Sequence, residues 1–280
     1  MKNKILPPCS YQGGKQRVSK EIVDYIFDTV LINNETKFYD LCCGSGAITI
    51  ELINRGVKPN NIIMLDKSSW GEFWHNIGTG IFNIEKFYNY SQKVPRDKGK
   101  IQNYISELSK KLVDVDECYI YLLLQASSFG GKQIWNENQV WKNTSFRSYW
   151  QPTENSKRRS PVNPMQPMIG EIENRVKIIS EKCKGVTCYR EDINYILDKV
   201  ESDNCVIYID PPYSNTTGYG FNFDINDFLS ELFNETLSPI FVSEKESISD
   251  ESILLNFNGV KGGISGNKIG KNQEWLSVFR

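Results

Sequence analysis

Short apolar runs alternate with longer amphipathic stretches along most of the chain, and this pattern predicts an α/β fold. The run Lys37–Cys42 indicates a buried strand, which leads through a glycine-containing turn into an apolar helix at Ala47–Ile53. Short apolar strands separated by helical stretches are typical of a mostly parallel sheet with helices on both faces. Further strands are expected at Ile62–Asp66, Gly185–Tyr189, Cys205–Ile209, Pro239–Val242 and Glu274–Phe279.

One long interval interrupts this alternation. Helical patterns occur at Lys100–Val113 and Glu117–Ser127, and an irregular stretch rich in Asn, Ser, Pro, Gly and aromatic residues follows at Phe129–Pro167. A structureless connection of that length is unusual inside a compact domain. We therefore predict a subdomain at residues 70–168, inserted into a catalytic domain formed by residues 1–69 and 169–280.

Composition narrows the function classes. The 280 residues include 33 basic and 34 acidic side chains, a balance that excludes a uniformly basic surface but permits a local basic patch. The longest strongly apolar run, Cys118–Leu124, is too short to cross a bilayer, and Met1–Pro8 lacks the apolar core of a signal peptide. We expect a cytoplasmic protein. The seven scattered cysteines and the single histidine, His75, disfavour a zinc site, a disulfide framework and a Ser-His-Asp hydrolase.

Two features at predicted strand ends suggest a nucleoside site. The turn Asp40–Gly46 carries two glycines, which let the backbone approach a ligand and direct helix N–H groups at it, although a plain tight connection is compatible with the same residues. Thr49 stands where a dinucleotide fingerprint requires its third glycine, so a nicotinamide cofactor is disfavoured. Asp66 ends the next strand about 20 residues later, where a carboxylate can accept ribose hydroxyls; the alternative is a helix cap.

The sharpest feature of the chain is Asp210-Pro211-Pro212-Tyr213, directly after a predicted strand. Two prolines cannot continue a central strand, so they form a rigid bend at the edge where open α/β sheets bind ligands. The bend combines an acceptor carboxylate, free carbonyls and an aromatic ring, which suits a planar base that carries an amine. Near the N-terminus, Tyr11–Lys15 enters a predicted helix at Val18–Val30; its Gly-Gly-Lys turn suits a carboxylate ligand or a plain helix start.

The segments Tyr11–Lys15, Asp40–Gly46, Asp66 and Asp210–Tyr213 resemble motifs X, I, II and IV of amino-methyltransferases. Their order is similar to that of the alpha group, which includes the Dam-type (D12 class) adenine-specific DNA methyltransferases of bacteria and phages. The resemblance implies a Rossmann-like S-adenosylmethionine-dependent methyltransferase fold with an inserted target-recognition subdomain. It also implies site-specific methyl transfer to adenine in double-stranded DNA. It does not decide whether the enzyme has a cognate restriction endonuclease in a restriction-modification system, or what its oligomeric state is.

The resemblance also assigns roles to individual residues. Tyr11 and Lys15 correspond to residues that contact the methionine part of S-adenosylmethionine, and Asp66 to the one that holds the ribose. Asp40, Gly44 and Gly46 belong to the binding turn, Asp192 matches the acidic residue that faces the cofactor's adenine, and Asp210 lies between cofactor and target amine.

For the reaction, the resemblance implies that Asp210 and the Pro211 carbonyl accept the amine hydrogens of a flipped adenine, while Tyr213 stacks on its ring. No protein-bound metal is implied. The loop Ser214–Gly220 is equally consistent with a segment that closes over the flipped base and with an ordinary surface loop. Methylation of RNA adenine or of the cytosine amine, and a non-catalytic nucleic-acid-binding module, are alternatives.

The predicted insertion carries residues suited to DNA contact, because basic side chains neutralise phosphates and aromatic rings can stack at a vacated base. The alternative is a solvated loop over a small aromatic core. The basic residues are Lys132, Lys142, Arg147, Lys157, Arg158 and Arg159, and the aromatic residues are Trp135, Trp141, Phe146, Tyr149 and Trp150.

Overall fold

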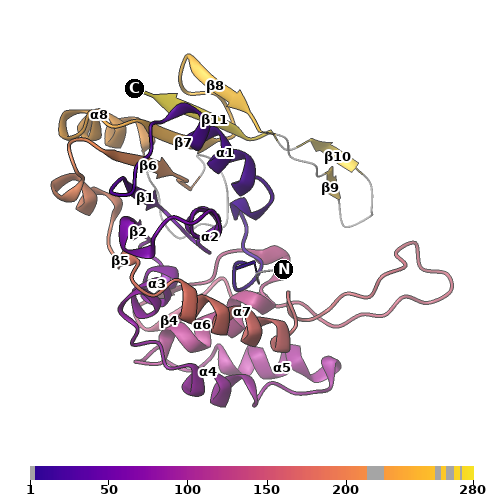
Figure 1. Cartoon of the computed structure of the whole chain (residues 1–280). Coiled ribbons are helices and arrows are strands. Elements are labelled where there is room, and N and C mark those ends of the chain that lie inside the picture. The colour runs from indigo at the N-terminus through magenta and orange to yellow at the C-terminus, as the bar shows by residue number, and fades with distance from the viewer. Residues whose placement is uncertain (1–3, 213–223, 256–259, 263–267, 272) are drawn as a thin grey trace.

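A seven-stranded sheet forms the centre of the computed structural model, which describes residues 4–212, 224–255, 260–262, 268–271 and 273–280 (Figure 1). The first five strands in spatial order run parallel, and the sixth is antiparallel to both of its neighbours. The mostly parallel sheet confirms the predicted Rossmann-like α/β fold. The spatial order is β5 (Thr187–Tyr189), β2 (Ile62–Leu65), β1 (Lys37–Leu41), β6 (Cys205–Ile209), β7 (Ile240–Glu244), β11 (Trp275–Phe279) and β8 (Glu251–Leu254).

Alternate side chains of the central strands enter two separate cores. In β1, Phe38 packs into the larger core, whereas Tyr39 and Leu41 pack into the smaller one. Residues of α8 (Ile225–Glu235) and of the 3-10 helix η4 (Ile193–Lys199) complete the smaller core. The larger core lies on the opposite face and includes residues of α1 (Ser19–Thr29), α2 (Ala47–Asn54) and α3 (Ser69–Thr79). Both faces of the sheet are therefore covered, as the apolar strands predict.

A layer of helices lies beside the sheet and shares its larger core (Figure 1). Helix α6 (Glu117–Ser127) is buried along its whole length and contacts α3 and α5 (Lys98–Leu108), while α3 also packs against β5. The ring of Trp70 in α3 makes an edge contact with that of Tyr121 in α6, with centroids 5.2 Å apart. None of the described helices combines the length and apolar character needed to cross a membrane. The layer consists of α4 (Ile84–Ser91), α5 (Lys98–Leu108), α6 (Glu117–Ser127) and α7 (Ile169–Lys182).

The division into residues 1–69 with 169–280 and an insertion at 70–168 remains a prediction. Helix α3 begins at the predicted boundary, yet it follows β2 and packs on β5, so its position is that of a sheet-covering helix. Helix α6 has the predicted bounds.

Some predicted bounds differ from the observed ones. The helix expected at Lys100–Val113 begins at Lys98, because Asp97 caps it through the N–H of Gly99 at 2.9 Å. It ends at Leu108, and the N–H of Val113 donates instead to the carbonyl of Gln139. Elements that were not predicted include α7, β8, the hairpin β3 (Trp135–Glu137) with β4 (Val140–Lys142), the hairpin β9 (Val260–Gly262) with β10 (Lys268–Lys271), and the short 3-10 helices η1 (Lys15–Arg17), η2 (Pro59–Asn61) and η3 (Phe129–Gly131).

Between β4 and α7 the chain extends away from the helical layer as a long projection (Figure 1). We call residues 147–163 the arm. Trp150 and Val162 exchange two backbone hydrogen bonds near its base, at 2.9 and 3.1 Å. Lys98 of α5 donates to the side chain of Asn163 at 3.0 Å. The base of the arm is thus fixed to the body.

Candidate active site

A pocket opens at the carboxyl ends of β1, β2 and β6. This is the edge at which open α/β sheets bind ligands. Most of the site residues expected from the sequence line it, although they come from distant parts of the chain. They are Tyr11, Lys15, Asp40, Gly44, Asp66, Asp192, Asp210 and Pro211.

The two glycines of the first turn have different roles. Gly44 has a φ of +50° and lines the pocket, and the ring of Tyr11 lies so close that a Cβ on Gly44 would come within 2.8 Å of it. Gly46 is not among the lining residues. It has a φ of +72° and precedes α2, and a Cβ there would meet the Trp74 ring at 2.2 Å. Gly44 therefore shapes the pocket, whereas Gly46 permits the packing behind it.

Asp66 joins the second strand to this glycine turn. Its Oδ2 accepts the backbone N–H of Gly44 at 2.7 Å, and its Oδ1 accepts the N–H of Ser68 at 2.9 Å. Ser68, not Asp66, caps α3 by accepting the N–H of Trp70. Burial raises the pKa of Asp66, although the hydrogen bonds from Ser68 and Gly44 lower it. The Ser68 hydroxyl also donates to Oδ1, so of the roughly four acceptor positions of the carboxylate about one remains for a ribose hydroxyl.

Asp40 anchors the helix that follows the glycine turn. Its Oδ2 accepts both the N–H of Thr49 at 3.1 Å and the hydroxyl of Thr49 at 2.7 Å. The side chain is 2% exposed, and burial raises the pKa of Asp40 to about 7 against the lowering effect of these hydrogen bonds. This carboxylate therefore fixes the start of α2 relative to β1 at the floor of the pocket.

Asp192 lies at the exposed rim of the pocket. Its carboxylate accepts the N–H of Asn194 at 3.3 Å, which caps η4, and pairs with Lys67 at 3.0 Å. The hydrogen bond from Lys67 lowers the pKa of Asp192. The carboxylate is thus ionised at the place where the resemblance puts the cofactor's adenine.

Asp210 and Lys15 form an ion pair at the other end of the pocket. The N–H of Asp210 donates to the carbonyl of Leu41 at 3.1 Å, which extends the pairing of β6 with β1 by one residue. The Lys15 ammonium contacts Asp210 Oδ1, lies 3.3 Å from Glu274 Oε1 and donates to the Gly13 carbonyl at 3.1 Å. Lys15 was expected to contact the methionine part of the cofactor; in this structure its ammonium lies between two carboxylates.

Tyr213 and the loop Ser214–Gly220 lie outside the described residues, so their predicted roles have no structural counterpart here. Pro211 and Pro212 line the pocket next to Asp210, which agrees with a rigid bend at the end of β6.

Several residues of the site were missed in the sequence. Glu274 was predicted only as part of a strand. An acidic residue next to an apolar run is unusual, and it could have indicated a functional side chain. Gln133 belongs to the predicted insertion, and nothing in the sequence placed it at the pocket. Its Oε1 is buried and has no hydrogen-bond partner among the described residues. Gln12, Cys42 and Cys43 line the pocket within the segments that were predicted to form it, whereas the lining residues Lys67, Ile193 and Tyr208 were not predicted.

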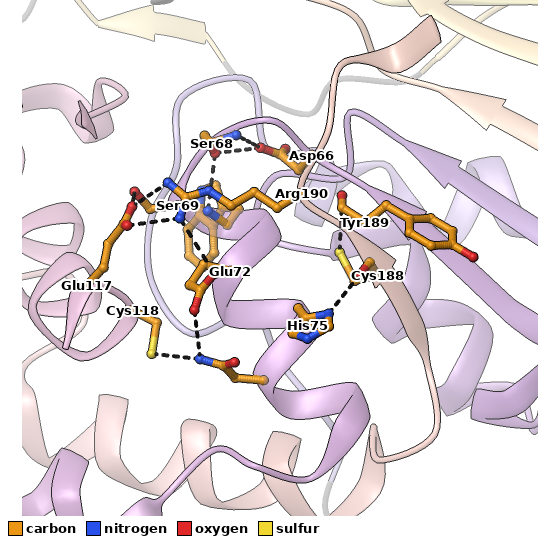
Figure 2. Close-up of polar contacts among 12 residues, drawn as sticks. Asp66, Ser68, Ser69, Glu72, His75, Glu117, Cys118, Cys188, Tyr189 and Arg190 are labelled. Atoms are coloured by element: carbon orange, nitrogen blue, oxygen red, sulfur yellow. Dashed lines mark hydrogen bonds and ion pairs between the residues drawn. The ribbon is translucent and has the colours of Figure 1, made fainter. Parts of the chain in front are cut away.

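A partly buried polar network connects the helical layer to the site (Figure 2). Glu117 of α6 accepts two hydrogen bonds from the Arg190 guanidinium, at 2.9 and 2.7 Å, and one from the Ser69 hydroxyl at 2.7 Å. Arg190 also lies 3.5 Å from Glu72 of α3. Since Ser69 and Arg190 lie within three residues of Asp66 and Asp192, the network connects α6 to both strand ends.

The arm and its surroundings divide into exposed and structural residues. Lys157, Arg158 and Arg159 are exposed on the arm. Arg147 instead donates to the Ser128 carbonyl at 2.8 Å and to Gln166, and burial lowers its pKa. Arg147 is therefore a structural residue.

The aromatic residues of the region divide in the same way. Trp141 and Phe146 are buried, and Trp141 stacks on Tyr121 with ring centroids 6.1 Å apart, so both are core residues rather than DNA-facing ones. Trp150 remains exposed, and Phe129, which was not predicted, is 51% exposed.

The pocket suits S-adenosylmethionine. The pocket is bordered by the turn at Gly44, where a Cβ would collide with the Tyr11 ring. The carboxylates of Asp66 and Asp210 lie at two different parts of the pocket wall. A nucleoside linked to a positively charged amino acid matches this arrangement of hydrogen-bond acceptors and negative charge.

Comparison with known proteins agrees with this chemistry. No curated protein matches the chain. A family model for D12 class N6 adenine-specific DNA methyltransferases matches residues 11–246, most of the chain, from Tyr11 at the pocket wall to beyond Asp210. This match spans every segment that lines the pocket, so the chain belongs to the D12 class of N6 adenine-specific DNA methyltransferases, enzymes that methylate adenine in DNA with S-adenosylmethionine.

Proposed function

We propose that the pocket binds S-adenosylmethionine along its length and that Asp210, at one end, receives the target adenine. The observation that supports this proposal is the convergence of Tyr11, Gly44, Asp66 and Asp210 on one pocket. These residues come from four separate segments, the ones that resemble the family's motifs X, I, II and IV.

The cofactor's orientation follows from the lining residues. Asp66 is proposed to accept the ribose hydroxyls, and Asp192 at the rim to lie near the adenine ring. Gly44 leaves room for close approach of the backbone turn, with Tyr11 packed over it. The methionine end then lies toward Lys15 and Asp210. When bound, S-adenosylmethionine supplies an electrophilic methyl group attached to a positively charged sulfur.

Asp210 has the central role in the chemistry we propose. The exocyclic amine of adenine is a poor nucleophile because its lone pair is delocalised into the ring. Asp210 and the Pro211 carbonyl accept its two hydrogens and orient the lone pair toward the methyl group, so that positioning supplies much of the acceleration. The same acceptors stabilise the positive charge that develops on the amine nitrogen. In such a direct in-line transfer the nitrogen–methyl bond would form as the sulfur–methyl bond breaks, S-adenosylhomocysteine would leave, and the nitrogen would lose one proton to Asp210 or to solvent. No covalent enzyme intermediate is needed.

An adenine stacked in a duplex cannot reach this pocket, so the target base must rotate out of double-stranded DNA. Tyr213 follows Pro212 and is proposed to stack on the extruded ring. The exposed basic side chains of the arm, Lys157, Arg158 and Arg159, are proposed to contact phosphates and to hold the duplex against the pocket mouth.

Product analysis tests the proposal. The purified protein is incubated with methyl-labelled cofactor and double-stranded DNA, and the digested nucleosides are separated. We expect the label in N6-methyl-2′-deoxyadenosine. The variant Asp210→Asn keeps the shape of the side chain but removes its charge, and we expect its methylation rate to fall about 10³-fold. Asp227→Asn, on the exposed surface of α8, is the matched control.

Three outcomes would contradict the proposal. A labelled cytosine product or a preference for RNA would assign the pocket to one of the alternative substrates. Cofactor binding without transfer to any nucleic acid would favour the non-catalytic binding module. Full activity of a folded Asp210→Asn protein would remove Asp210 from the chemistry.

A further inference from the structure

The Lys15 ammonium is shared between two carboxylates from opposite parts of the chain. One is Asp210, which follows β6, and the other is Glu274, which immediately precedes β11. The side chains of Lys15 and Glu274 are 3% and 7% exposed, whereas that of Asp210 is 18% exposed and lines the pocket. Asp210 therefore faces the pocket, and Glu274 lies behind it.

This cluster carries more negative than positive charge. Burial would lower the pKa of Lys15, but the charges of Asp210 and Glu274 outweigh it, so the ammonium stays protonated. Burial raises the pKa of Asp210 to about 7; Lys15 opposes this shift, and Glu274 adds to it. Glu244 of β7 is close enough to interact with the same charges, and burial raises its pKa as well. Two carboxylates thus compete for one ammonium.

This competition matters because the Lys15 ammonium contacts Asp210 Oδ1 and withdraws negative charge from the carboxylate that is proposed to accept the incoming amine. Release of Lys15 into an apolar environment would be costly, since an unpaired buried charge is strongly unfavourable. Glu274 already lies 3.3 Å from the ammonium, so a small side-chain movement transfers the pairing from one carboxylate to the other.

We propose that Glu274 is a positioning residue, which retains the Lys15 ammonium while Asp210 accepts the target amine. The inference rests on the proposed role of Asp210. Glu274 itself is firmly placed, because its carbonyl accepts the N–H of Leu255 at 2.8 Å and the next residue, Trp275, pairs with Glu244 in the sheet. Lys15 is held on its other side by the Gly13 carbonyl. Only the tip of the Lys15 side chain has to move.

The test is Glu274→Gln, which keeps the size of the side chain and removes its charge. We expect kcat for DNA methylation to fall about tenfold or more, because Lys15 then stays on Asp210. The affinity for S-adenosylhomocysteine, measured by calorimetry, should change by no more than about twofold. The acid limb of the pH profile of kcat should move to lower pH, since loss of the Glu274 charge lowers the pKa of Asp210. Glu244→Gln is the matched control, because it removes a nearby charge that has no direct ion pair with Lys15 among those described.

A double-mutant cycle shows whether Glu274 acts through Lys15. Single-turnover rates are measured for Glu274→Gln in the wild-type and Lys15→Met backgrounds. We expect the effect of Glu274→Gln to disappear in the second background. An equal effect in both backgrounds, or an unchanged kcat and pH profile for a folded Glu274→Gln protein, would overturn the inference.

The same data separate this inference from the proposed function. An active Asp210→Asn variant would refute the role of Asp210, and the inference with it. An inactive Asp210→Asn variant beside a fully active Glu274→Gln variant would refute the role of Glu274 alone.

Discussion

The carboxylate of Asp66 accepts the backbone N–H of Gly44 at 2.7 Å, so the end of the second strand holds the glycine turn after the first. The proposed ribose ligand and the proposed cofactor turn are consequently one unit. A change at Asp66 should affect both the shape of the pocket and its affinity.

Substitution of Asp66 should therefore weaken cofactor binding. We expect Asp66→Ala to reduce the affinity for S-adenosylhomocysteine by about 1.5–3 kcal/mol, the usual loss when hydrogen bonds to a charged group are removed. Isothermal titration calorimetry measures this change. Ser68→Ala is the control, because it removes a donor to Asp66 but leaves its carboxylate and the Gly44 contact in place. Unchanged affinity of the Asp66→Ala protein would exclude Asp66 from the site.

Replacement of Gly46 should destabilise the protein through packing. Gly46→Ala brings a Cβ to 2.2 Å from the Trp74 ring and places alanine at a φ of +72°, so we expect a loss of about 3 kcal/mol or more in the free energy of unfolding. Gly130→Ala is a close control, since its φ is +70° and no atom lies within 4 Å of the added Cβ. It should cost only about 1–2 kcal/mol. Equal losses in urea unfolding would show that the Trp74 contact relaxes without cost.

The buried carboxyl of Asp40 should make stability depend on pH. Its pKa is raised from the ordinary value of 3.8 to about 7, so between these values the folded protein binds more protons than the unfolded chain. The free energy of unfolding contributed by this group therefore falls as the pH rises through that window. Asp40→Asn lacks this dependence and can still accept from Thr49.

Urea unfolding from pH 4 to 8 measures the difference between Asp40→Asn and the wild type. Between pH 4 and 7, the free energy of unfolding of Asp40→Asn should rise relative to that of the wild type by up to about 1.4 kcal/mol per pH unit. Above pH 7 this difference should become constant. A difference that stays constant over this range would contradict the raised pKa.

The ion pair of Arg190 with Glu117 should be important for joining α6 to the sheet. Arg190→Leu leaves the mostly buried Glu117 without its main partner, and we expect a loss of about 2–3 kcal/mol, less than for a fully buried pair because Arg190 is partly exposed. The double variant Arg190→Leu with Glu117→Leu should recover part of this loss. Additive losses in urea unfolding would mean that the two side chains do not stabilise each other.

The exposed basic cluster of the arm should contribute to DNA affinity without sequence preference. Each phosphate contact that is lost should reduce the slope of log affinity against log salt by about 0.9. Replacement of Lys157, Arg158 and Arg159 by alanine should therefore weaken binding to target and non-target DNA alike, with a shallower salt dependence and unchanged cofactor affinity. Fluorescence anisotropy at several salt concentrations measures both. Relaxed specificity in addition would indicate that one of the three contacts a base edge. An unchanged slope would place the DNA surface elsewhere.

The strands and the proposed cofactor pocket were predictable because both depend on local pattern. Buried parallel strands are short continuous apolar runs, and polar residues that directly follow them meet at one sheet edge, as Asp66 and Asp210 do. The exposed, partly polar strand β8 carries no such pattern. The position of Gln133 depends on how the helical layer packs, which no local pattern encodes. Gly46 shows a further limit, because a glycine required for packing and one required for ligand approach look alike in sequence.

The N-terminal segment that carries Tyr11 and Lys15 is fastened to the region after α6. Gln12 donates its N–H to the Gly131 carbonyl at 2.7 Å, and Ser10 donates to that of Gln166 at 2.9 Å. The predicted target-recognition segment, residues 70–168, therefore touches the chain that leads to Lys15 and Asp210, the proposed reaction centre. We expect a chimera that imports residues 70–168 from a relative of different target sequence to need a compatible stretch around residues 10–12 as well, because the graft would otherwise displace Lys15.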